Sequence, residues 1–167
     1  NFTNKIQTNF DIAAKACEIE IDILGEPVGK QDQYIAAIGG LTAFEFIPDG
    51  SVVASPIRIK KYIAQELEEN LLLFYTGIRR SASDELSTLE NDITRKSSRV
   101  TENLNEIKKL GYETLTKLEN HDLISFGRLL NSQWKLKLNR SPSKVHLQLN
   151  SIIQTGIESG AIGGKLI

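Results

Sequence analysis

Hydrophobic positions in the second half of the chain repeat at helical spacing. From residue 86 to 118, apolar side chains recur every three, four, seven or eight positions, which predicts one apolar stripe along a helix. Residues 120–122 (Asn-His-Asp) break this pattern and supply an N-cap for a second long helix over 123–134. Residues 141–142 (Ser-Pro) interrupt it again, and a third stripe follows over 145–157. The stripes predict a helical core.

The first part of the chain mixes helical and strand-like spacing. Residues 8–24 begin with the capping-box pair Thr8 and Asp11, and their alanine-rich start favours a helix. Residues 19–23 also alternate between apolar and acidic positions, which is a strand signal. We interpret 8–24 as a helix because the alanines set the period. After a loop rich in glycine and proline, residues 30–38 predict a short helix.

Strands are expected in the middle of the chain. Segments 41–47 and 51–59 are joined by Pro-Asp-Gly, and the fixed φ of proline and the permissive φ of glycine favour a hairpin. Residues 63–67 suit a short helix, and the continuous apolar run 71–75 is typical of a buried central strand. The predicted fold class is therefore α+β, with a β-hairpin and a central strand beside several long helices.

Composition narrows the classes of function. The 167 residues are 40% apolar, which suffices for one compact domain or slightly more and excludes general disorder. The charges, 20 Lys and Arg against 21 Asp and Glu, give a net charge of −1 and argue against a nucleic-acid partner. A single cysteine, with no long apolar stretch and no signal peptide, favours a cytoplasmic protein without a membrane partner. The two histidines lie far apart in the sequence, so no zinc site is expected.

Two loops are candidates for chemistry. Residues 25–34 combine two glycines, a proline and several polar side chains ahead of a helix, and Asp32 lies near the helix start. The alternative is an ordinary turn with an N-cap. Residues 76–83 join the predicted strand to a helix and carry Arg79, Arg80 and two serines, a combination that favours an anion such as phosphate. The alternative there is a serine cap with solvated arginines.

A set of motifs runs through the whole chain in order. Residues 18–24 (Glu-Ile-Glu-Ile-Asp-Ile-Leu) lead into 25–33 (Gly-Glu-Pro-Val-Gly-Lys-Gln-Asp-Gln). Further motifs lie at 35–40 (Ile-Ala-Ala-Ile-Gly-Gly), 74–78 (Phe-Tyr-Thr-Gly-Ile) and 160–166 (Gly-Ala-Ile-Gly-Gly-Lys-Leu). In these motifs the chain resembles the GHMP sugar kinases, and among them the bacterial D-glycero-D-manno-heptose 7-phosphate kinases. The Gly-x-Pro-x-Gly-x-x-Asp-Gln pattern is similar in galactokinases.

The resemblance implies an ATP-dependent kinase that acts on a sugar or sugar phosphate, with ATP and Mg²⁺ as cofactors. Asp32 takes the place of the catalytic aspartate, which orients or deprotonates the attacking hydroxyl. Glu20 takes the place of the glutamate that binds magnesium. Four further residues are implied to bind substrate: Gln33, Tyr34, Arg80 and Ser81.

The resemblance also implies that the chain is a fragment. The family's phosphate-binding loop, Pro-x-x-x-Gly-Leu-Gly-Ser-Ser, does not occur in the sequence, and methionine is absent altogether. Residues 1–59 then correspond to the end of an N-terminal kinase domain and 60–167 to a truncated C-terminal domain. We expect such a fragment to be inactive alone and to self-associate, as a homodimer or otherwise. The alternative function is a non-catalytic helical interaction or regulatory module derived from a kinase.

Overall fold

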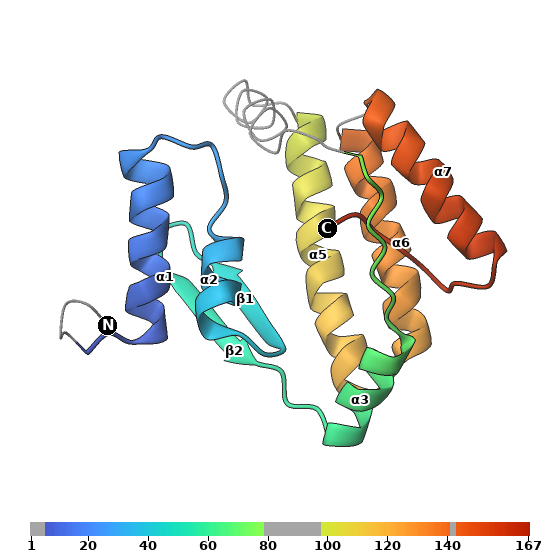
Figure 1. Cartoon of the computed structure of the whole chain (residues 1–167), viewed down its shortest axis with the longest axis horizontal. Helices are drawn as coiled ribbons and strands as arrows, with labels where there is room; N and C mark the ends of the chain where they lie inside the picture. Colours follow the sequence, from blue (N-terminus) through green and yellow to red (C-terminus); the bar gives the residue numbers. More distant parts are fainter. Residues whose placement is uncertain (1–5, 79–97, 141–142) are drawn as a thin grey trace. The chain divides into compact units, whose positions relative to one another are not determined.

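The computed structural model describes residues 6–78, 98–140 and 143–167, which form two compact units (Figure 1). The described part of the first unit comprises residues 6–57. The second unit comprises residues 58–78, 98–140 and 143–167. None of the helices in these ranges is both long and apolar enough to cross a membrane.

The first unit opens with the predicted helix, which changes character halfway. Helix α1 (Asn9–Cys17) is capped by Thr8, whose hydroxyl accepts a hydrogen bond from the Asp11 N–H while the Asp11 carboxylate accepts one from the Thr8 N–H. The chain continues directly into the π-helical segment η1 (Glu18–Ile23). The alternation in this segment therefore does not produce a strand, but it coincides with a wider helical turn.

A second helix and a hairpin complete the first unit. Helix α2 (Gln31–Ile38) ends at Gly39, and strands β1 (Thr42–Phe46) and β2 (Val52–Pro56) pair antiparallel, as the sequence predicts. The side chains of Ala13, Cys17 and Tyr34 form the core; each is at most 8% exposed. Partly buried apolar side chains from η1, α2 and both strands pack around them.

The second unit is helical, and its helices follow the predicted stripes, except that residues 86–97 of the first stripe lie outside the described residues. Its elements are α3 (Lys61–Asn70), α5 (Ser98–Glu119), α6 (Leu123–Arg140) and α7 (Lys144–Glu158). Helices α5 and α6 lie side by side (Figure 1). The break between them is the predicted one, because the carboxylate of Asp122 accepts a hydrogen bond from the Ser125 N–H at 3.0 Å and caps α6.

Trp134 on α6 is the largest buried side chain among the described residues and joins α6 to α7. It is 1% exposed, and its indole N–H donates to the Asn150 side-chain oxygen at 3.0 Å. Its ring also meets His146 edge to face, with centroids 5.7 Å apart. Because the indole N–H has a partner, this large ring is buried without leaving a donor unsatisfied.

The C-terminal tail packs tightly against α6. A Cβ atom on Gly163 would lie 1.8 Å from the backbone oxygen of Gly127, so only glycine fits at position 163. Further along the tail, the Lys165 ammonium donates to the Gln133 side-chain oxygen at 3.4 Å. Loss of water contact lowers the pKa of Lys165.

The prediction of a buried central strand at residues 71–75 is wrong. The run follows α3 with extended backbone at Leu71 but is exposed: Leu72 is 79%, Leu73 is 83% and Tyr75 is 89% exposed. The only sheet in the described part of the chain is the β1–β2 hairpin, which does not include this run. An apolar, β-prone sequence cannot become a buried strand without neighbouring strands that supply hydrogen bonds and cover.

Candidate active site

The first candidate carboxylate, Glu20, projects from the π-helical segment η1. The widened turn shows in the backbone, where the Leu24 N–H donates to the Ile19 oxygen at 2.9 Å. The following loop folds back, because Gly25 adopts φ +69° and the Glu26 N–H donates to the backbone oxygen of Glu20 at 2.9 Å. Single π-type turns are frequent at functional sites because they change the direction of a side chain within a helix.

The Glu20 carboxylate is bound by Gln33 on helix α2. The Gln33 amide N–H donates to Glu20 Oε2, a contact between residues 13 positions apart in the sequence. The Gln33 side chain is buried, at 9% exposure, and its oxygen Oε1 has no hydrogen-bond partner in the described structure. From its sequence, Gln33 is expected to contact substrate, and the sequence does not predict its contact with Glu20. The signal that could have found it is that Gln33 and Ala37 are four residues apart and share the inner face of α2.

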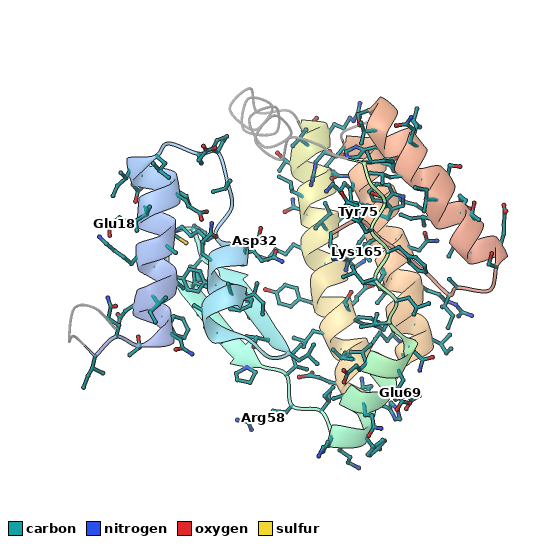
Figure 2. The ribbon with its side chains drawn as sticks, viewed as in Figure 1. Glu18, Asp32, Arg58, Glu69, Tyr75 and Lys165 are labelled. Atoms are coloured by element: carbon teal, nitrogen blue, oxygen red, sulfur yellow. The ribbon has the colours of Figure 1, made fainter. Side chains whose placement is uncertain are left out.

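Asp32 precedes Gln33 and lies in the first turn of α2 (Figure 2). It is exposed, and no hydrogen bond or ion pair links its side chain to another residue in the described ranges. A carboxylate is favoured in a first turn, where free backbone N–H groups and the helix dipole present positive partial charge. The structure thus places Asp32 and the Glu20–Gln33 contact on adjacent elements of one unit.

Two lysines near this region are engaged elsewhere. Lys30, at the N-cap of α2, donates from its ammonium to the Gly50 backbone oxygen at 3.0 Å and so ties the loop to the hairpin turn. Lys15 forms an ion pair with Glu18 at 2.7 Å. Neither lysine is therefore the partner of Asp32 or Glu20, and the charge of both carboxylates is left for another group.

The buried thiol of Cys17 belongs to the core behind these residues. Burial raises the pKa of Cys17, with the nearby positive charge of Lys30 acting in the opposite direction. A raised pKa keeps the thiol protonated near neutral pH, so this cysteine is a packing residue and not a nucleophile.

The remaining predicted site residues are placed differently. Tyr34 is 8% exposed and its ring meets Phe10, Phe44 and Phe46 edge to face, with centroids 5.9 to 6.4 Å apart. Its position in the core gives it a packing role, and its contact with substrate stays a prediction. Arg80 and Ser81 lie outside the described residues.

The described ranges hold no group of three or more His, Cys, Asp or Glu side chains placed to bind a metal. Glu20 nevertheless offers one carboxylate that is held in place by the Gln33 amide. Magnesium is commonly held by one or two carboxylates together with substrate phosphates and water. A single carboxylate of this kind is compatible with that type of coordination.

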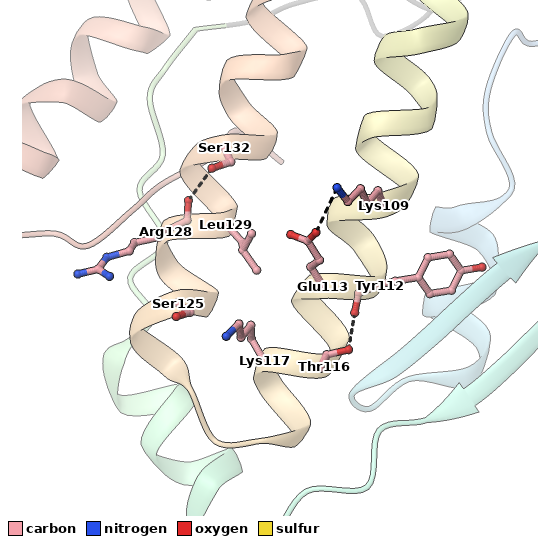
Figure 3. A pocket seen from close by; sticks show the side chains of 9 residues that line it. All are labelled: Lys109, Tyr112, Glu113, Thr116, Lys117, Ser125, Arg128, Leu129 and Ser132. Carbon is pink, nitrogen blue, oxygen red and sulfur yellow. Dashed lines mark hydrogen bonds and ion pairs between the residues drawn. The ribbon is translucent and has the colours of Figure 1, made fainter.

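A groove of about 570 Å³ lies between α5 and α6 in the second unit (Figure 3). Several of its polar groups are engaged within the second unit. Lys117 pairs with Asp122 at 3.1 Å, and the hydroxyls of Thr116 and Ser132 donate to backbone oxygens of their own helices.

The chain is similar in sequence and in fold to kinases of heptose phosphates. It is 33% identical over 156 residues to the D-glycero-alpha-D-manno-heptose 7-phosphate kinase of Campylobacter jejuni, covering 93% of this chain and 45% of that protein. A crystal structure of a D-glycero-D-manno-heptose 1-phosphate kinase from Bacteroides thetaiotaomicron matches with a TM-score of 0.69 and 25% identity. That match covers 99% of this chain and 44% of the other.

These similarities confirm the resemblance that the motifs predict, and they confirm the mixed fold of helices and a small sheet. The chain spans about half the length of the relatives it matches. No model of a known protein family matches it.

Proposed function

We propose that this chain is part of an ATP-dependent kinase that phosphorylates a hydroxyl of a sugar or sugar phosphate of the heptose 7-phosphate kind. The observation that carries the proposal is that two carboxylates lie in the same unit: Asp32 is exposed at the start of α2, and Glu20 on η1 is held by Gln33 of α2. Similarity to a heptose 7-phosphate kinase over 93% of the chain supports the same class of substrate.

In this proposal Asp32 orients the substrate hydroxyl and accepts its proton. The hydroxyl oxygen bonds to the γ-phosphorus, the bond from that phosphorus to the β–γ bridging oxygen breaks, and ADP leaves. Phosphoryl transfer asks a protein mainly for positioning and charge stabilisation. Asp32 therefore contributes by aligning the hydroxyl as much as by accepting its proton.

Glu20 holds the divalent cation in this scheme. Bound Mg²⁺ supplies positive charge that neutralises the phosphate oxygens of the nucleotide. The chain's own contribution is a carboxylate that is fixed by Gln33 but whose charge no lysine of the described residues cancels. Substrate contacts are assigned to Gln33, Tyr34, Arg80 and Ser81 by the resemblance alone.

The assignment of residues to two kinase domains is also part of the proposal. Residues 1–59 would be the end of an N-terminal kinase domain and 60–167 most of a C-terminal one. The 167-residue chain contains no Gly-Leu-Gly-Ser-Ser loop, so we expect it to bind ATP weakly when isolated. Self-association of the isolated chain is supported by the exposed apolar run 71–75, and light scattering at increasing concentration tests it.

The decisive experiment compares two aspartates of the first unit in the protein expressed from its complete coding sequence. With heptose 7-phosphate as the probe, Asp32→Asn should lower kcat by about 100- to 10,000-fold, the range expected for a positioned general base. The matched control is Asp22→Asn, which removes an exposed carboxylate from η1 and should leave kcat unchanged. Near-normal turnover by Asp32→Asn would refute the assignment.

A further inference from the structure

We propose that Gln33 is a positioning residue for the cation site: its amide N–H fixes the Glu20 carboxylate without cancelling the charge that a divalent cation needs. This inference rests on the proposed kinase function. It assigns Gln33 a role that differs from the substrate contact implied by the resemblance.

The direction of the Gln33 amide is fixed by chemistry. A carboxylate only accepts hydrogen bonds, so the amide group facing Glu20 must be the NH₂ and not the carbonyl oxygen. The opposite arrangement would set two acceptors against each other. Gln33 Oε1 is therefore the atom left buried without a partner in the described structure.

A neutral donor suits a cation ligand better than a charged one. An amide N–H orients the Glu20 carboxylate without cancelling its charge, whereas a lysine or arginine would compete with the metal. The nearby lysines are occupied, with Lys30 on the Gly50 oxygen and Lys15 on Glu18. The Glu20 oxygen that Gln33 does not contact is thus left for a cation.

The Gln33 side chain is held on one side only. It is 9% exposed, and its oxygen Oε1 is buried without a hydrogen-bond partner within the described residues. The contact with Glu20 is therefore the hydrogen bond that orients both side chains. A partner that orients a metal-binding carboxylate typically contributes to the affinity for the metal.

The test measures cation binding, separately from activity. Using the protein from its complete coding sequence with ATP present, free Mn²⁺ is followed by electron paramagnetic resonance during titration. Gln33→Met keeps the side-chain length but removes both polar atoms, and it should weaken Mn²⁺ binding about 10- to 100-fold, as loss of an outer-shell partner does. Gln31→Met is the matched control; it changes an exposed glutamine of the same helix and should bind Mn²⁺ normally.

Two further variants separate a failure of this inference from a failure of the proposed function. Gln33→Asn keeps the amide but shortens it, so it should also weaken Mn²⁺ binding, and it provides the test if Gln33→Met does not fold by circular dichroism. Glu20→Gln should weaken Mn²⁺ binding at least as much as either. If Glu20→Gln weakens binding and folded Gln33 variants do not, this inference is wrong and the proposed function stands. If Glu20→Gln also binds normally, the metal assignment of the proposed function fails as well.

In turnover assays a positioning role has its own signature. Gln33→Met should raise the Mg²⁺ concentration needed for half-maximal rate by the same 10- to 100-fold, with kcat largely recovered at saturating Mg²⁺. A loss of kcat that excess Mg²⁺ does not restore would contradict the inference, because it would place Gln33 on the substrate.

Discussion

The Glu20–Gln33 region of the first unit and the α5–α6 groove of the second differ in how their polar groups are used. The groove measures about 570 Å³, and both of its lysines and two of its hydroxyls are engaged with neighbouring residues of the same helices or their connection. The Glu20–Gln33 region presents an exposed aspartate, a held carboxylate and a buried oxygen without a partner among the described residues. The two regions therefore differ in how many of their carboxylates remain available to a ligand.

The largest expected effect distinguishes the two regions by one substitution in each. Glu20→Gln should lower kcat/KM at limiting Mg²⁺ by at least about 100-fold, because it removes the charge that holds the cation. Arg128→Ala in the groove should leave kcat/KM within about twofold, as expected for an exposed surface change. Coupled kinase assays on both variants decide between the two regions, and a large loss in Arg128→Ala would show that the groove takes part.

Substitutions in the core of the second unit are expected to change the stability of the protein. Trp134→Ala removes a ring that is 1% exposed and a hydrogen bond to Asn150, and should lower the free energy of unfolding by about 3–5 kcal/mol. Urea denaturation followed by far-ultraviolet circular dichroism measures it. A change below about 1 kcal/mol would mean that the α6–α7 contact contributes little.

Packing of the tail provides a smaller test in the same unit. Gly163→Ala would bring a Cβ into the Gly127 backbone, so the tail must shift, and we expect a loss of about 1–3 kcal/mol in thermal or urea unfolding. Gly156→Ala is the control, because nothing lies within 4 Å of its added Cβ. It sits inside α7, where alanine should stabilise by up to about 1 kcal/mol.

The smallest expected effect concerns the cap of α6 and depends on pH. Hydrogen bonds from Ser125, helped by Lys117, lower the pKa of Asp122 to about 2, from 3.8. A lowered folded-state pKa contributes stability that is complete above pH 3.8 and is lost as the pH falls towards 2. Asp122→Asn keeps the cap without the charge, so its melting temperature should fall below that of the wild type at pH 5, and the difference should shrink as the pH falls through 2 and vanish near pH 1. A difference that is as large at pH 1 as at pH 5 would contradict this cause.

Much of the fold was predictable because its elements carry local signals. The Thr8–Asp11 capping box and the Asp122 cap depend on residues three positions apart, and both form as the sequence indicates. The run 71–75 was misinterpreted because a strand depends on partners that no local pattern reveals.

In the candidate site, too, local features were predictable and a long-range contact was not. Asp32 could be placed at the start of a helix because the preceding glycines and proline end the loop there. The Gln33–Glu20 contact was missed because it joins residues 13 positions apart on two helices. Its existence depends on the packing of α1 and η1 against α2, and on a π turn that the apolar and acidic alternation of 19–23 does not specify.

The π turn makes the spacing between Glu20 and the loop intolerant of insertions and deletions. Each residue of an α-helix advances the chain by about 100° around the axis. Removing one residue from 21–23, in the wider π-helical segment, would likewise rotate the point at which the chain leaves η1 and carry α2, with Gln33 and Asp32, away from Glu20. We expect functional homologues to vary the side chains of this segment while keeping its length.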